Sequence, residues 1–151
     1  MATAYSGVYP VYENQFRINI AGRGGSAAAT YENIADMESF SVSFDDNVEE
    51  WTPMTTAGWV RRLKTGKGIT ISLSGKRNVG DKGNDYIASK AWASGKDCNS
   101  ALEWTFPNGD KVLIPCVINV TSVGGDSTNV EPLEFDCMSD GEPEFTKAAT
   151  T

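Results

Sequence analysis

Two stretches of strict alternation, separated by a long connection, constrain the fold of this chain more than any other feature. Residues 39–44 and 69–74 each alternate an apolar side chain with a small hydroxyl side chain. This alternation has the period of a strand that buries one of its faces. Most connections between strands in compact domains are far shorter than the 16 residues from Asp45 to Val60. The pattern predicts a β-rich chain with one oversized loop.

The long loop is too apolar to be a disordered linker. It contains Trp51, Pro53, Met54 and Trp59 within a few residues of one another. Apolar groups that gather on an exposed segment mark a surface that another chain covers. We therefore interpret the loop as a contact surface for a second polypeptide.

Turn signals and alternating runs predict the remaining elements. An Asn-Gly pair at 108–109 indicates a hairpin. Asn84 as N-cap and Gly95 as terminator indicate one helix over 85–94. Strands are expected at 15–21, at 31–44 with a break near 35–36, at 61–74 with an interrupting turn at 66–68, and at 101–106, 111–122 and 130–138. Six or seven strands and one short flanking helix predict a mainly β fold, a β-sandwich or partly open barrel.

The length of 151 residues fits one domain. We expect a single domain over 1–151, with an N-terminal arm at 1–13, the long loop at 45–60 and a mobile, acidic C-terminal tail at 139–151. No apolar run approaches the roughly 20 residues that span a bilayer, and the first residues lack the pattern of a signal peptide. The expectation is synthesis and folding in the cytoplasm, with no membrane as partner.

The absence of histidine restricts the possible chemistry. It removes the commonest general base and zinc ligand, and with them Ser-His-Asp, Cys-His and HExxH sites. Asp45, Asn47 and Glu49 alternate as in a calcium loop, but Glu50 stands where that loop needs glycine. The three cysteines form no CxxC pair and are interpreted as reduced thiols, with Cys116 and Cys137 on buried strand faces. We expect no catalysis, no metal and no cofactor.

Charge is distributed in blocks that add to a net charge of −7. Residues 31–50 contain seven acids and no base, 61–96 contain nine bases and two acids, and 126–146 contain seven acids and no base. One interpretation is a subunit with oppositely charged surfaces, which select orientation when copies meet. The alternative, that each block is a solvated face, stays open. The basic run is a weak candidate for phosphate binding, because the chain has no overall basic surplus.

The four tryptophans leave two functions to weigh. Trp92 on the expected helix and Trp104 in a strand are interpreted as core residues. Trp51 and Trp59 suit an interface between subunits. The same pair would equally suit a carbohydrate-binding β-sandwich module, and this alternative stays open.

Nine sequence segments, in order and spread over nearly the whole chain after the N-terminal arm, resemble phage tail tube proteins. These are the major tail proteins of tailed phages and related phage-like particles. The segments are 36–45 (DMESFSVSFD), 48–54 (VEEWTPM), 58–62 (GWVRR), 70–77 (TISLSGKR), 80–86 (GDKGNDY), 104–109 (WTFPNG), 124–130 (GGDSTNV), 132–135 (PLEF) and 138–141 (MSDG).

The resemblance implies a structural protein of the virion tail, assembled in the bacterial host cytoplasm. Members of this family form homo-hexameric rings whose inner sheets close a continuous β-barrel channel. The rings stack head to tail into a tube, and the long loop and the termini reach adjacent rings. The tube carries DNA into the host without binding it specifically. The partners implied are other copies of the chain, a tape-measure protein and tail-terminator or tail-tip proteins.

The residues suggest where such contacts would lie. Head-to-tail stacking is a heterologous contact that needs two unlike surfaces. The candidate inter-subunit residues are Asp45, Asp46, Glu49, Glu50, Trp51, Pro53, Met54, Trp59, Arg61, Arg62 and Lys64. Hydroxyls and carboxylates offer DNA phosphates no clamp. The candidate channel-lining residues are therefore Ser39, Ser41, Ser43, Thr70, Ser72, Ser74, Glu134 and Asp136. The alternative, that these rows face the outside, stays open.

Overall fold

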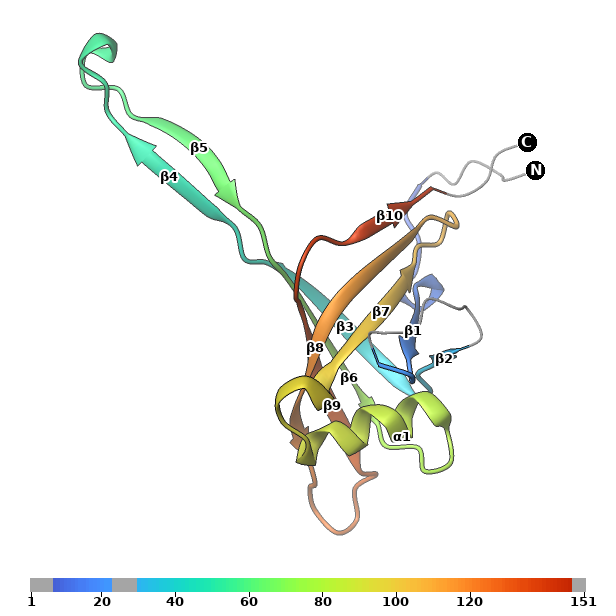
Figure 1. Cartoon of the computed structure of the whole chain (residues 1–151). Helices are drawn as coiled ribbons and strands as arrows, with labels where there is room; N and C mark the ends of the chain where they lie inside the picture. The colour runs from blue at the N-terminus through green and yellow to red at the C-terminus, as the bar shows by residue number, and fades with distance from the viewer. Residues whose placement is uncertain (1–6, 23–29, 148–151) are drawn as a thin grey trace.

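A long, curved antiparallel sheet forms the body of the molecule, and a two-stranded arm projects from it (Figure 1). The computed structural model describes residues 7–22 and 30–147. The strands are β1 Gln15–Asn19, β2 Tyr31–Asn33, β3 Met37–Phe44, β4 Asn47–Trp51, β5 Arg61–Gly66, β6 Ile69–Lys76, β7 Asn99–Thr105, β8 Lys111–Val123, β9 Pro132–Ser139 and β10 Glu144–Thr146. One α-helix, α1 Lys82–Ser89, packs beside the sheet.

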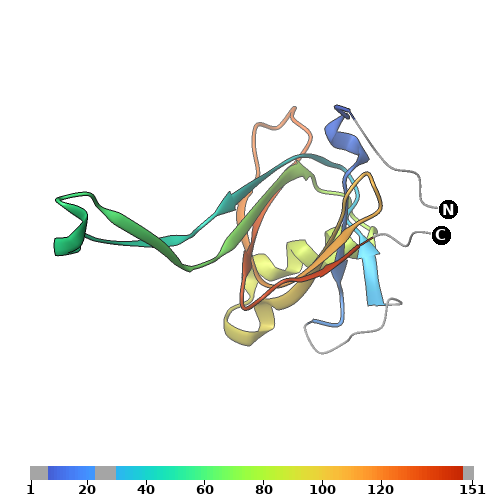
Figure 2. The ribbon, with the colours of Figure 1, turned by 90° about the horizontal axis from the view of Figure 1, so that it is seen from above.

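The strand order in the body is β2-β1-β7-β8-β9-β6-β3, and β10 pairs with the start of β8. The sheet curls around the core without closing, as the view from above shows (Figure 2). The fold is mainly β, as predicted, and matches the expected sandwich or open barrel. β4 and β5 form a separate two-stranded sheet.

The core lies on one face of the central strands. Ile71 and Leu73 of β6 and Phe135 of β9 are at most 1% exposed, because alternate side chains of a strand point to the same face. Cys116 and Cys137 are buried there as predicted. Trp104 of β7 packs against this core, stacked on Phe16 and edge-on to Phe40, which confirms its assignment.

The helix begins earlier than predicted, at Lys82, with Asp81 as its N-cap. The Asn84 side chain is fully buried instead of capping. Its amide donates to the carbonyls of Ala35 (3.1 Å) and Lys76 (3.0 Å), which ties α1 to the sheet. The helix ends at Ser89, and Trp92, in the 3₁₀ turn that follows, is 92% exposed. The prediction that Trp92 is a core residue was wrong, because α1 ends at Ser89 and Trp92 lies in a separate 3₁₀ turn without buried residues.

Glycine makes the close approach of the helix possible. A Cβ at Gly83 would lie 2.2 Å from the carbonyl oxygen of Asn33, so only glycine fits where α1 meets β2. The predicted break near 35–36, which separates β2 from β3, the turn at 66–68 and the Asn108–Gly109 hairpin are all confirmed.

The C-terminal segment differs from the predicted mobile tail. Residues 144–146 form β10 on β8, and Phe145 contacts Phe106 with ring centroids 6.0 Å apart. Residues 1–6 of the expected arm and 148–151 of the expected tail lie outside the described residues. Within residues 7–22 and 30–147, no helix has the length and apolar character needed to cross a membrane.

Candidate assembly surfaces

The eight predicted channel-lining residues lie together on one face of the sheet. Across β3 and β6, Ser39 is opposite Ser74, Ser41 opposite Ser72, and Ser43 opposite Thr70. Across β6 and β9, Ser72 is opposite Asp136 and Ser74 opposite Glu134. Directly opposed residues share a face, so the three rows form one continuous surface on the side away from the core. We call it the polar face.

The polar face extends onto β8 through residues that the sequence analysis missed. Asn119 is opposite Asp136, and Ser122 is opposite Glu134 after a bulge at Thr121. The alternation of residues 118–121 between apolar and polar side chains would have identified Asn119 but not Ser122, because the bulge shifts the register. A shallow depression of about 260 Å³ lies over the four strands, lined by residues that include Ser41, Ser72 and Thr121.

The polar face has an acidic surplus. Its rows carry Glu134 and Asp136 but no arginine or lysine between residues 39 and 43, 70 and 74, or 134 and 136. The hydroxyl of Ser74 donates to Glu134 Oε1 over 3.0 Å. Lys76, at the end of the β6 row, forms an ion pair with Glu38 at 3.0 Å. The surface therefore offers hydroxyls and carboxylates but no uncompensated cation.

Two unpaired strand edges border the polar face. Among the described strands, β3 pairs with β6 alone, so its other edge is open over Met37–Phe44. On the opposite side, β7 pairs with β8 only as far as Val117. The rest of β8, from Ile118 to Val123, has β9 as its one described strand partner. Open edges of this kind readily accept a strand from another chain.

The connection predicted as an irregular loop is a regular β-hairpin. Val48 to Trp51 of β4 pair with Lys64 to Arg61 of β5, and a 3₁₀ turn at Met54–Thr56 lies at the tip. Ala57 and Gly58 adopt left-handed backbone conformations that reverse the chain. Figures 1 and 2 show this hairpin extending away from the body. The strand over Arg61–Gly66 was expected, but its partner β4 was missed, because the adjacent Glu49 and Glu50 place charges on both faces of Asn47–Trp51 and break the alternation.

The hairpin is exposed along its length, and its apolar side chains have no cover within the described chain. Every residue of β4 is exposed. Trp51 is 43% exposed, Trp59 78% and Met54 fully exposed. Pro53 is half-buried at the turn, where its carbonyl accepts a bond from the Thr56 hydroxyl (3.0 Å).

Contacts within the hairpin hold its shape. Glu50 pairs with Arg62 at 2.8 Å and Asp46 with Lys64 at 2.7 Å. The Arg61 guanidinium lies 5.6 Å from the centre of the Trp51 ring. The Asn47 side-chain amide donates to Glu49 Oε1 (3.0 Å) and, across to β5, to the Thr65 hydroxyl (2.8 Å). The hairpin is therefore a preformed arm.

These ion pairs correct the interpretation of the charge blocks. The acidic block 31–50 and the basic block 61–96 neutralise each other within one chain, through Glu32–Lys82 (3.9 Å) and Glu38–Lys76 as well as the two hairpin pairs. They do not form two separate, oppositely charged surfaces, because adjacent antiparallel strands bring the blocks side by side. Among the described residues, Glu142 and Glu144 of the third block form no ion pair, so this block is not neutralised in the same way.

The two sets of predicted residues meet at the root of the hairpin. The amide of Asp45 donates to the carbonyl of Gly68 (2.8 Å), and the hydroxyl of Thr70 donates to Asp45 Oδ2 (2.9 Å). The strands of the hairpin thus continue directly from β3 and β6. The polar face and the hairpin are separate surfaces joined at this point.

The buried thiol of Cys137 is a poor nucleophile. A hydrogen bond with Cys116, together with burial, raises the pKa of Cys137 well above its ordinary value, so the thiol keeps its proton. Across residues 7–22 and 30–147, no group of three or more His, Cys, Asp or Glu side chains could hold a metal ion.

The fold is similar to that of chains in gene transfer agent particles. A chain from the tail of an empty particle, solved by helical refinement with C6 symmetry, superposes with a TM-score of 0.72 at 18% identity, over 93% of this chain and 100% of that one. A chain from the virion of a native particle gives a TM-score of 0.69 at 17% identity, with the same coverage. No family model and no curated protein matches the sequence. At this identity the similarity establishes a shared fold.

Proposed function

We propose that this chain is a structural subunit of a phage-like tail tube. Copies assemble into hexameric rings, the rings stack head to tail, and DNA passes through the resulting channel into the host. The likeness of the fold to a chain in a gene transfer agent tail supports this proposal. The virion tail is then the place of the protein, and other copies of the chain are its main partners.

The polar face between two open edges is the observation that carries the proposal. In a ring, the edge of β3 in one copy would pair with Ile118–Val123 of β8 in the next. Such pairing satisfies the backbone groups of both edges and joins the four-stranded faces into one closed barrel. The core side of the sheet is covered by side chains that include Ile18 of β1, Leu102 of β7 and Ile87 of α1, so the polar face is the side free to line the channel.

The chemistry of the polar face suits a conduit. Arginine and lysine contacts dominate affinity for the DNA backbone, and each added contact slows release. Glu134 and Asp136, repeated around a ring, would instead create a negative potential that repels phosphates. A tape-measure protein would occupy the same channel before DNA, and terminator or tip proteins would cover its ends.

The hairpin supplies the contact between rings. From Asp45 to Pro53 it extends by about 3.3 Å per residue, a reach on the order of 25–30 Å beyond the sheet. Its exposed tryptophans and methionine gain burial only when another molecule covers them. Stacking provides that cover.

Electron microscopy of concentrated, negatively stained protein tests the proposal. Hollow tubes with six-fold end views are expected. A chain that stays monomeric at every concentration, salt and pH tried contradicts it. Glycan binding by such a monomer would favour the carbohydrate-binding alternative, although Arg61 already lies over the Trp51 ring in this structure.

A further inference from the structure

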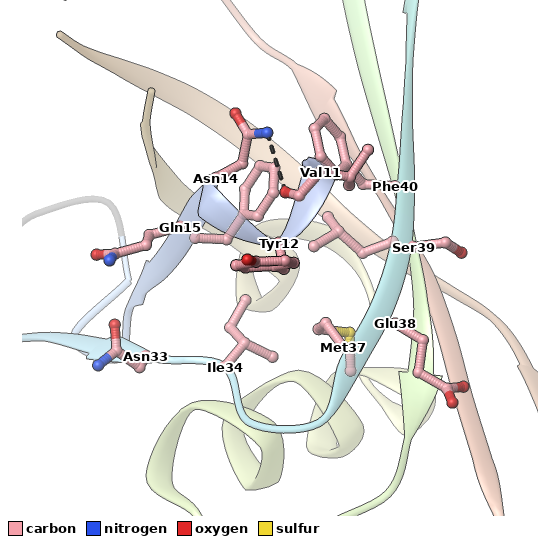
Figure 3. Close-up of a pocket in the computed structure, with 12 residues that line it drawn as sticks. Val11, Tyr12, Asn14, Gln15, Asn33, Ile34, Met37, Glu38, Ser39 and Phe40 are labelled. Carbon is pink, nitrogen blue, oxygen red and sulfur yellow. Dashed lines mark hydrogen bonds between the residues drawn. The ribbon is translucent and has the colours of Figure 1, made fainter. Parts of the chain in front are cut away.

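A pocket of about 590 Å³, with both apolar and polar side chains in its wall, lies at the seam where the curled sheet fails to close (Figure 3). β1 and the turn before it line one side, and the first half of β3 lines the other. Tyr12, Phe16, Ile34, Met37 and Phe40 supply its apolar part, and its polar residues include the uncharged Asn14, Gln15 and Asn33. Tyr12 is 83% exposed, so no described part of the chain covers the pocket mouth. We call it the seam pocket.

The tip of the hairpin has matching chemistry. Residues 52–60 carry no charge. Met54 and Trp59 are the most exposed of its large side chains, at 101% and 78%. The tip thus presents two exposed apolar side chains on a preformed arm, and burying them would desolvate no charge of residues 52–60.

The position of the seam pocket suits a head-to-tail contact. Repeated stacking requires donor and acceptor surfaces at opposite ends of the subunit. The hairpin leaves β3 after Phe44, whereas the seam pocket lies beside Met37, Glu38 and Phe40 at the start of that strand. A second pocket, of about 740 Å³, lies at the hairpin root between Phe44 and Phe145. It is at the same end as the arm and cannot receive the arm of a copy stacked in the same orientation.

Charge also favours the seam pocket. Its one charged lining residue is Glu38, which is paired with Lys76 and points away from the cavity (Figure 3). The root pocket is lined by Lys67 and Glu142, neither of which has an ion pair. Covering those two with an uncharged tip would desolvate unpaired charges at a cost.

We propose that the hairpin tip of one copy inserts Met54 and Trp59 into the seam pocket of a copy in the next ring. This inference rests on the proposed stacking of rings and names the acceptor of the arm. The two side chains of a single tip bury far less than the roughly 1,200–2,000 Å² of a stable interface. The contact is therefore weak between single subunits and becomes strong when a whole ring engages.

Cysteine cross-linking in the full chain tests the docking. Thr55→Cys at the tip is combined with Asn33→Cys at the mouth of the seam pocket, both at exposed positions. The matched control combines Thr55→Cys with Glu142→Cys at the root pocket. The native thiols are at most 6% exposed and stay unreactive. Each sample is assembled, treated with a short bis-maleimide and run on a denaturing gel.

The expected result is a ladder of linked chains for 55/33, because each copy offers one donor and one acceptor cysteine. Single variants give at most dimers, and 55/142 gives no ladder. Tubes that form without a 55/33 ladder, or that give a 55/142 ladder, overturn the docking and leave the tube proposal standing. Absence of tubes from the unmodified chain overturns both.

A bulky maleimide placed on the single variant Asn33→Cys before assembly gives a second readout. It should raise the concentration needed for tubes at least tenfold, while the same label on Glu142→Cys should not. Equal effects of the two labels would contradict the assignment of the seam pocket.

Discussion

The body and the hairpin use the same antiparallel pairing but differ in where their apolar side chains lie. In the body, alternation places Ile71, Leu73 and Phe135 on one side, where they are at most 1% exposed. In the hairpin, Val48 and Leu63 fall on opposite faces and both remain about half exposed. The body is stabilised by its own core, whereas the hairpin is held by its ladder, two ion pairs and one cation–π contact.

The difference separates folding from assembly. Regions with few buried apolar contacts contribute little to global stability and open locally. Substitutions in the hairpin should therefore affect contacts between copies, and substitutions in the body should affect the fold. Each prediction below tests that separation.

Shortening the hairpin should have the largest effect. Trp51 and Arg61 are directly opposed, so replacing residues 52–60 by Asn-Gly closes β4 and β5 with a two-residue turn. We expect tubes to disappear from electron micrographs while the free energy of unfolding changes by less than about 1 kcal/mol. Normal tubes from this variant would contradict the role proposed for the hairpin tip.

Aromatic truncation in the two regions gives the next largest contrast. Phe135→Ala removes a fully buried ring and should lower the free energy of unfolding by about 3–5 kcal/mol. Trp59→Ala, at 78% exposure, should change it by about 0.5 kcal/mol or less. Urea denaturation of the unassembled chain measures both, and similar losses at the two sites would show that the hairpin packs on the body.

Alkaline pH should weaken the body by a smaller amount. The raised pKa of Cys137 means that the folded state retains a proton that the unfolded state loses. This contribution is complete below the unfolded thiol pKa of about 8.5 and is lost as pH rises toward the folded value. Urea denaturation between pH 7.5 and about 10.5 measures the decline. In the Cys137→Ala variant the free energy of unfolding should fall less steeply with pH. An identical slope would show that the Cys137 thiol does not cause the decline.

The hairpin ion pairs should have the smallest effect. Glu50 and Arg62 have side chains more than half exposed, so Glu50→Gln should cost at most about 1 kcal/mol of hairpin stability and leave the global value unchanged. Hydrogen exchange at the amides of β4 should accelerate, with no change at β6. Exchange that accelerates in both strands would show that the two regions open together.

Most of the body followed from its sequence. The sequence alone makes the hydroxyl rows on 39–43 and 70–74 and the carboxylates of Glu134 and Asp136 candidates for one surface, and the register brings them together on one face of the sheet. Alternation is a local signal, and pairing of neighbours in an antiparallel sheet preserves it. What the polar face looks onto, a channel or open solvent, depends on how copies assemble, and local alternation carries no information about that.

The failures have non-local causes. The helix boundary moved because Asn84 bonds the carbonyls of Ala35 and Lys76, which are distant in sequence. The charge blocks neutralise each other because β4 lies beside β5, a pairing that composition does not reveal. β10 forms on an edge of β8 that only the three-dimensional fold provides.

The unbroken run of backbone from β3 through Asp45 into the hairpin has a mechanical consequence. A pull at the tip acts along the strand axes, so the ladder bonds share the load in shear instead of opening one after another. If copies stack as we propose, tension from a neighbouring ring would pass through the hairpin into β3 and β6 of the body.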